Sequence, residues 1–142
     1  MSNSIYFVGH ICYILFVIAT KKLGQGRGAE YIMYSNEEIM EFVSLVAEVV
    51  EPDRIILFGS YAYGVPTDKS DIDLLVIKNG KDFTINDETE YAVAIHRARM
   101  RRQIKPRYDV FFGTDDQIIE IASRGGSYVD ALQRGKVVYE RL

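Results

Sequence analysis

Two aspartates stand one residue apart in the stretch "DIDLLVIK", residues 71–78, near the middle of the chain. The branched apolar residues around them are typical of a buried β-strand. Side chains alternate between the two faces of a strand, so Asp71 and Asp73 should point the same way, ~6.6 Å apart along the strand. Two like charges at this spacing raise each other's pKa. A hard divalent cation such as Mg²⁺ would relieve the repulsion and would also accept the phosphate oxygens of a substrate.

A third carboxylate, Asp109, stands in "YDVFFG", residues 108–113, which we interpret as another buried strand. An unpaired charge among such large apolar residues is costly, so Asp109 is a candidate functional residue. If the two strands are neighbours, Asp109 lies one strand spacing, about 4.8 Å, from the Asp71 strand. The three carboxylates could then surround two metal ions about 3.5–4 Å apart, which clamp the attacking and leaving oxygens of a phosphoryl centre.

Gly59 and Ser60 follow the apolar run "RIILF" and open a short helix predicted over residues 60–64. Free backbone N–H groups and the helix dipole at such a start suit a phosphate. Glycine lets the phosphate approach the backbone, and serine adds a hydroxyl donor. A lone Gly–Ser is usually only a turn, and a lone Asp-x-Asp is usually a solvated strand face. Together with Asp109 they indicate a phosphate site that faces a metal-binding strand.

The remaining elements must position these residues. A capping box of Ser35 and Glu38 predicts an amphipathic helix that ends near Pro52. We expect, in order, strand 54–59, strand 71–78, a helix over 86–104 capped by Asn86 or Asp87, strand 108–113, a helix capped by Thr114 to about Ser123, helix 127–135 with Gly135 as its C-cap, and a strand over 136–140. Helices alternate with strands, which predicts an α/β domain with a small sheet.

Composition narrows the class of protein. The chain has 142 residues, 48% of them hydrophobic, which fits one packed domain. A formal net charge of −3 argues against a general nucleic-acid binder. Cys12 is the only cysteine, which excludes an intramolecular disulfide and a cysteine-rich metal site and fits a reducing, cytoplasmic setting.

The N-terminal segment, residues 1–32, is atypical. It holds a mostly apolar stretch over 5–19, shorter than the about 20 residues of a spanning helix and without the basic start of a signal peptide. Three interpretations stay open: a mis-assigned start, with Met33 as the natural one; an extra strand or helix that packs or oligomerises; or a weak membrane anchor. We therefore place the domain at residues 33–142.

A basic run, "HRARMRRQIKPR", covers residues 96–107. One interpretation is an ordinary solvated helix face. The other is that one or two of its arginines hold a triphosphate or an acidic partner. The sequence does not choose between them, and His96 is expected to be an ordinary surface or half-buried residue.

The stretch "GSYAYGVPTDKSDIDLLVI" resembles the minimal nucleotidyltransferases of the DNA polymerase β superfamily, whose motif is Gly–Ser, a ten-residue gap and Asp-x-Asp. The resemblance covers residues 33–142 and implies an α/β (α+β) fold with a small mixed sheet in order 1-2-3 and helices packed mainly on one side. It implies that two Mg²⁺ ions are the cofactors, that ATP is the substrate, and that AMP is transferred with release of pyrophosphate. Gly59 and Ser60 would hold the β- and γ-phosphates. Asp71 and Asp73 would bind both metals, and Asp109 would complete the metal site that activates the acceptor hydroxyl.

Larger enzymes of that superfamily carry a further domain that holds the acceptor, and residues 110–142 are too few for one. We therefore expect a partner or a second subunit to bring the acceptor. Resembling proteins pair with small HEPN toxins and transfer AMP to a toxin tyrosine, which implies a cytoplasmic antitoxin that is a protein adenylyltransferase. We expect no stable nucleic-acid binding and no membrane association. Two alternatives stay open: a transferase acting on a small molecule or an RNA end, and a toxin-binding module without catalysis.

Overall fold

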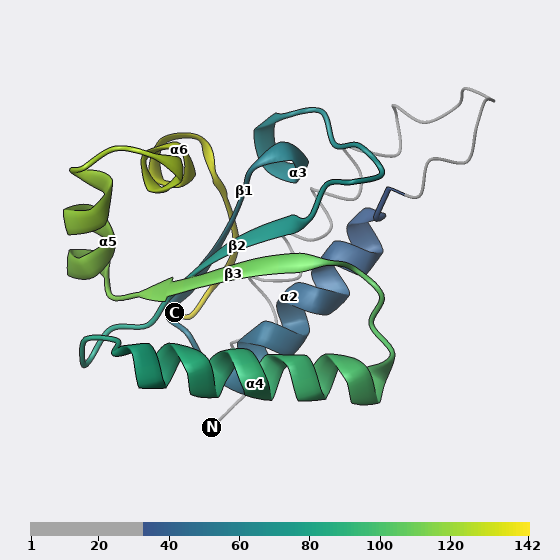
Figure 1. Ribbon diagram of the computed structural model, residues 1–142, viewed down its shortest axis with the longest axis horizontal. Coiled ribbons are helices and arrows are strands. Elements are labelled where there is room, and N and C mark those ends of the chain that lie inside the picture. The colour runs from purple at the N-terminus through teal and green to yellow at the C-terminus, as the bar shows by residue number, and fades with distance from the viewer. Residues whose placement is uncertain (1–32) are drawn as a thin grey trace.

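The computed structural model describes residues 33–142 (Figure 1). The interpretations of residues 1–32 lie outside the described residues, so the boundary at Met33 stays a prediction. The elements run α2 (Asn36–Val50), β1 (Arg54–Phe58), α3 (Ser60–Tyr63), β2 (Ile72–Ile77), α4 (Ile85–Arg102), β3 (Tyr108–Gly113), α5 (Asp115–Ala122), α6 (Ser127–Arg134) and β4 (Lys136–Glu140). Among these described helices, none is long and apolar enough to cross a membrane. The predicted α/β class is confirmed.

The four strands form one mixed sheet in the order β3-β2-β1-β4. β1 runs antiparallel to both β2 and β4, whereas β2 and β3 are parallel because α4 carries the chain back between them. The predicted order of the first three strands is therefore present, with β4 added beside β1. The register makes Asp73 the partner of Phe58 on one side and of Asp109 on the other.

The two long helices, α2 and α4, cover one face of the sheet, and α5 and α6 lie over one end of the opposite face (Figure 1). Strand residues alternate between these two layers. The α2–α4 layer buries Ile55, Leu57, Ile72, Leu74 and Val76, and the α5–α6 layer buries Ile56, Phe58, Leu75 and Ile77. Asp73 alternates with Ile72 and Leu74, so it belongs to the α5–α6 face.

Helix starts explain two boundaries. Ser35 caps α2 through the predicted capping box with Glu38, in which Ser35 N–H donates to Glu38 Oε2 at 2.8 Å. The predicted cap of the next long helix was wrong, since α4 begins after Thr84 and not after Asn86 or Asp87. Thr84 accepts from the N–H of Asp87, and the Asp87 carboxylate accepts from the N–H of Thr84. This second capping box starts the helix at Ile85.

Candidate active site

Gly59 forms the sharp turn between β1 and α3. It has φ 71° and ψ −156°, and its carbonyl accepts from the N–H groups of Ala62 and Tyr63 at 3.0 and 3.2 Å. Positive φ favours glycine over any other residue. The first N–H groups of a helix have no partner within the helix, so the turn presents Ser60 and the amides beside it as donors.

The Asp73 carboxylate packs directly against this turn. A Cβ built on Gly59 would overlap Asp73 Oδ2, so only glycine lets the carboxylate lie there. The glycine therefore serves two purposes at once, because it permits the turn and makes room for a candidate metal ligand. The predicted phosphate-binding turn and the predicted metal-binding strand thus touch each other in the structure.

Asp73 and Asp109 are register partners across the parallel pair β2 and β3. Burial raises the pKa of Asp73 to about 6, and the nearby charges of Asp109 and Asp71 add to the shift. The expectation of a buried strand around Asp109 was wrong: β3 is an edge strand, and Asp109 is exposed. Tyr108, Val110 and Phe112 face the α2–α4 layer instead, and Asp109 points to the other face.

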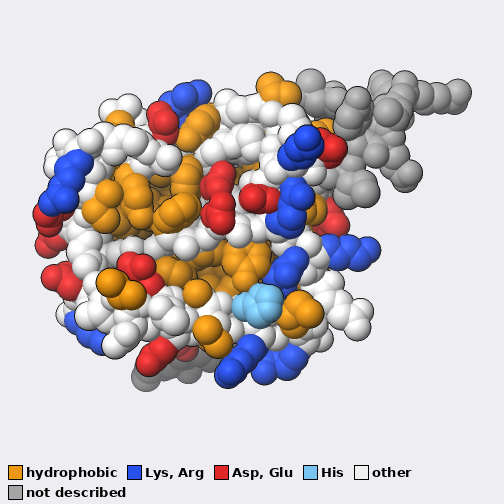
Figure 2. Space-filling model, in the orientation of Figure 1, with side chains coloured by type: hydrophobic (Ala, Val, Ile, Leu, Met, Phe, Trp, Pro, Cys, Tyr) orange, Lys and Arg blue, Asp and Glu red, His pale blue; other side chains and the backbone are white. Residues whose placement is uncertain are grey.

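These carboxylates lie on the part of the sheet that α5 and α6 leave open. In Figure 2 a group of acidic side chains stands in the middle of the visible face, between a hydrophobic patch and several basic side chains. Aromatic rings pack together on the α5–α6 face: Phe58 and Phe111 have ring centroids 5.8 Å apart, and Tyr128 meets Phe111 edge-on. A substrate can therefore reach the aspartates from solvent along this face.

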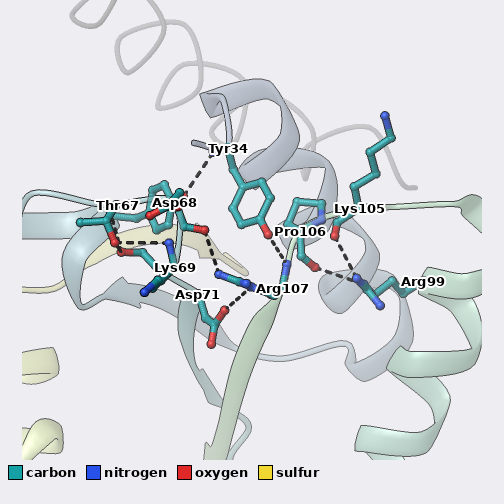
Figure 3. A network of polar contacts seen from close by, with 11 residues as sticks. Tyr34, Thr67, Asp68, Lys69, Asp71, Arg99, Lys105, Pro106 and Arg107 are labelled. Atoms are coloured by element: carbon teal, nitrogen blue, oxygen red, sulfur yellow. Dashed lines mark hydrogen bonds and ion pairs between the residues drawn. The ribbon is translucent and has the colours of Figure 1, made fainter. Parts of the chain in front are cut away.

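Asp71 lies directly before β2, and a guanidinium holds its carboxylate. Arg107 Nε donates to Asp71 Oδ1 at 2.8 Å, and the same side chain donates to the carbonyl of Asp68 at 3.1 Å (Figure 3). In the sequence, Arg107 stands out only as a member of the basic run. The signal that could have found this contact is its position two residues before Asp109, which matches Asp71 two residues before Asp73.

The donor set suits a hard divalent cation, although the three aspartates do not form a closed cluster. In the part of the chain that the structure describes, no three acidic, histidine or cysteine side chains converge closely enough to hold a metal ion. Burial and, secondarily, like charge disfavour the ionised form of Asp73, and a cation would offset that cost. Arg107 holds Asp71 Oδ1, so its guanidinium would compete with such a cation for the Asp71 carboxylate.

Two arginines of the basic run have structural contacts. Arg99 donates to the carbonyls of Pro106 and Lys105 and lies over the Tyr108 ring at 5.5 Å, which fixes the connection into β3. Arg102 forms an ion pair with Glu48 and so ties α4 to α2. For these two residues the structure favours a role in packing. His96 is exposed, in line with the prediction of an ordinary surface residue.

The tyrosines beside the phosphate turn pack against neighbours. Tyr61 stacks on Tyr34 with ring centroids 5.8 Å apart, and its hydroxyl accepts from the N–H of Tyr34. Tyr63 lies under Arg134, 4.2 Å from the ring centroid. A separate pocket of about 140 Å³ lies in the connection between β2 and α4, lined among others by Lys78 and Tyr91, and contains none of the predicted site residues.

The comparisons with known proteins agree with this geometry. A family model described as nucleotidyltransferase domain matches residues 39–138. The matched range includes the Gly59–Ser60 turn and all three aspartates. The chain therefore belongs to the nucleotidyltransferase domain family. A search of curated proteins found no match.

Proposed function

We propose that this nucleotidyltransferase moves AMP from ATP, with Mg²⁺, to a hydroxyl group of another molecule. The observation that carries the proposal is the contact of Asp73 with the Gly59 turn on one side and its register pairing with Asp109 on the other. A triphosphate at the turn would place its α-phosphate beside both carboxylates. Nucleotidyl transfer needs hydrogen-bond donors that bind the phosphates to lie close to acidic residues that bind the cations.

Each residue then has a defined task. Backbone amides at Gly59 and Ser60, with the Ser60 hydroxyl, bind the β- and γ-phosphates and orient the leaving group. Asp71, Asp73 and Asp109 would hold the cations, which would neutralise charge at the α-phosphate. The acceptor oxygen bonds to the α-phosphorus, the bond to the bridging oxygen breaks, and pyrophosphate leaves with those electrons. Asp109, the most open of the three sites, accepts the proton of the acceptor hydroxyl and passes it to solvent.

We infer further that the acceptor is a tyrosine of a partner HEPN toxin, which makes this protein its antitoxin. Two features support the inference. The resemblance in the motif is to minimal nucleotidyltransferases that act in such pairs. The described residues form one small layered fold, and the carboxylates open onto its surface, so an acceptor can approach as a separate molecule.

Transfer is tested with the full chain, a neighbouring HEPN protein if its gene lies beside this one, and ATP labelled at the α-phosphate. We expect the label on the HEPN protein and an added AMP in its intact mass. Asp73→Asn and Asp109→Asn should each lower the rate ~10²–10⁴-fold. Asp116→Asn removes an equal charge from an exposed position on α5 and should leave the rate unchanged.

The alternatives give different results in the same experiment. Label on an RNA end or a small alcohol, with none on the HEPN protein, would establish the first alternative. An Asp73→Asn variant that adds no mass yet protects cells from the toxin as well as the parent does would establish binding without catalysis.

A further inference from the structure

Arg107 carries a side chain with no task in the steps above, although it touches a predicted metal ligand. It lies directly before β3 and reaches across to the chain before β2, where it contacts Asp71 and the carbonyl of Asp68. The two contacts join β3 to the loop that leads from α3 into β2 (Figure 3). The guanidinium therefore binds one oxygen, Oδ1, of a carboxylate that the proposed reaction would use for a cation.

The backbone of Arg107 is held firmly while its side chain remains accessible. Its N–H donates to the Tyr34 hydroxyl at 3.0 Å, and its carbonyl accepts from the N–H of Ile72 at 2.9 Å. The side chains of Arg107 and Asp71 are 51% and 40% exposed, so water reaches the ion pair. An exposed ion pair of this kind is weak, so a divalent cation can outcompete it.

The strand register shows that this ion pair belongs to the site. Ile72 is the partner of Tyr108, and Asp73 is the partner of Asp109. Asp71 and Arg107 therefore stand one step earlier along the same two strands. Two acidic residues on the β2 side, Asp71 and Asp73, thus meet Arg107 and Asp109 on the β3 side, so a guanidinium cation already lies beside the carboxylates.

We propose that Arg107 is a positioning residue that neutralises Asp71 until a divalent cation takes its place. Metal entry exchanges the guanidinium for the ion at Asp71, and it also breaks the contact of Arg107 with the Asp68 carbonyl. The loop over residues 64–71 is then released from β3 when the site is loaded. This inference rests on the proposed function, because it assumes that Asp71 is a metal ligand.

Binding of Mn²⁺ to the full-length protein without nucleotide, measured by calorimetry, tests the exchange. Arg107→Gln removes the competing cation and should tighten Mn²⁺ binding about two- to fivefold. Lys105→Gln is the matched control. Lys105 lies two residues before Arg107 and carries the same charge, but its side chain points away from Asp71 (Figure 3). It should change the affinity less than twofold. Arg107→Lys keeps the charge but loses the two-pronged contact and should give an intermediate affinity.

A double variant isolates the contact itself. In an Asp71→Asn background, Arg107→Gln should no longer tighten Mn²⁺ binding, because the carboxylate under competition is gone. Hydrogen exchange at residues 64–71 should become faster when Mn²⁺ is added to the parent and should already be fast in Arg107→Gln. Equal Mn²⁺ affinities for the parent and Arg107→Gln, or no Mn²⁺ binding by either, would overturn the inference. The transfer assay decides the proposed function separately.

Discussion

The Asp73 carboxylate occupies the space into which any side chain at Gly59 would have to project. Gly59→Ala should therefore displace Asp73 and strain a backbone with positive φ. We expect a loss of ~1–3 kcal/mol in the free energy of unfolding and loss of nucleotidyl transfer. Gly80→Ala is a matched control, because Gly80 also has positive φ but no atom lies within 4 Å of its built Cβ. Unfolding in urea and transfer assays on both variants check this, and equal effects of the two changes would contradict it.

The raised pKa of Asp73 makes the stability of the metal-free protein depend on pH. Its folded pKa of about 6 lies above its ordinary value of 3.8, so the folded state binds the proton more tightly. The stabilisation from this proton is fully present below about pH 4 and is lost as the pH rises through 6. Asp73→Asn should thus be more stable than the parent at pH 7.5 in EDTA, and the gap should close towards pH 4. Urea unfolding over this pH range measures the difference in the free energy of unfolding. If Asp73→Asn were less stable than the parent at pH 7.5, burial and like charge would not be the main influences on the Asp73 carboxylate.

Divalent cations should stabilise the folded protein through the same carboxylates. A ligand that binds only the folded state adds about 2.7 kcal/mol at a hundred times its dissociation constant. The melting temperature of the parent should rise with Mg²⁺ or Mn²⁺, and Asp73→Asn should show little rise. Asp130→Asn, an exposed acid on α6, should respond as the parent does. An identical rise in Asp73→Asn would place the cation elsewhere.

A chain that starts at Met33 should fold cooperatively. It keeps the Ser35 cap and the Tyr34 contacts with Tyr61 and Arg107. A chain that starts at Asn36 loses all of these and should be less stable by ~1 kcal/mol or more. Thermal and urea unfolding of both against the full chain check the expectation. Aggregation of the Met33 chain would show that residues 1–32 are structural.

Much of the fold and of the candidate site could be predicted because local signals agree. Ser35 and Thr114 cap helices as predicted, since capping signals are local. The apolar runs before Gly59 and after Asp71 form the two central strands. The ten-residue gap between Ser60 and Asp71 then suffices to bring the phosphate turn beside the Asp-x-Asp strand.

What escaped prediction depends on long-range placement. The exposure of Asp109 follows from β3 standing at the edge of the sheet, and nothing in its neighbours along the chain encodes an edge. The contact between Arg107 and Asp71 follows from the register of two parallel strands that are distant in the sequence. The start of α4 is set by a local signal, the Thr84 cap, but it was missed because Asn86 and Asp87 are equally acceptable N-cap residues.

The parallel pairing of β2 with β3 determines where the site can tolerate insertions and deletions. A slip of one residue between the strands would turn Asp109 towards α4 and dissolve the pairing with Asp73. The length of the connection between β2 and β3, in contrast, does not determine the register of the two strands, because side-chain packing against the helices fixes that register. Insertions at the exposed turn around Gly80 should therefore leave chemistry intact, whereas a single-codon deletion inside β3 should abolish it.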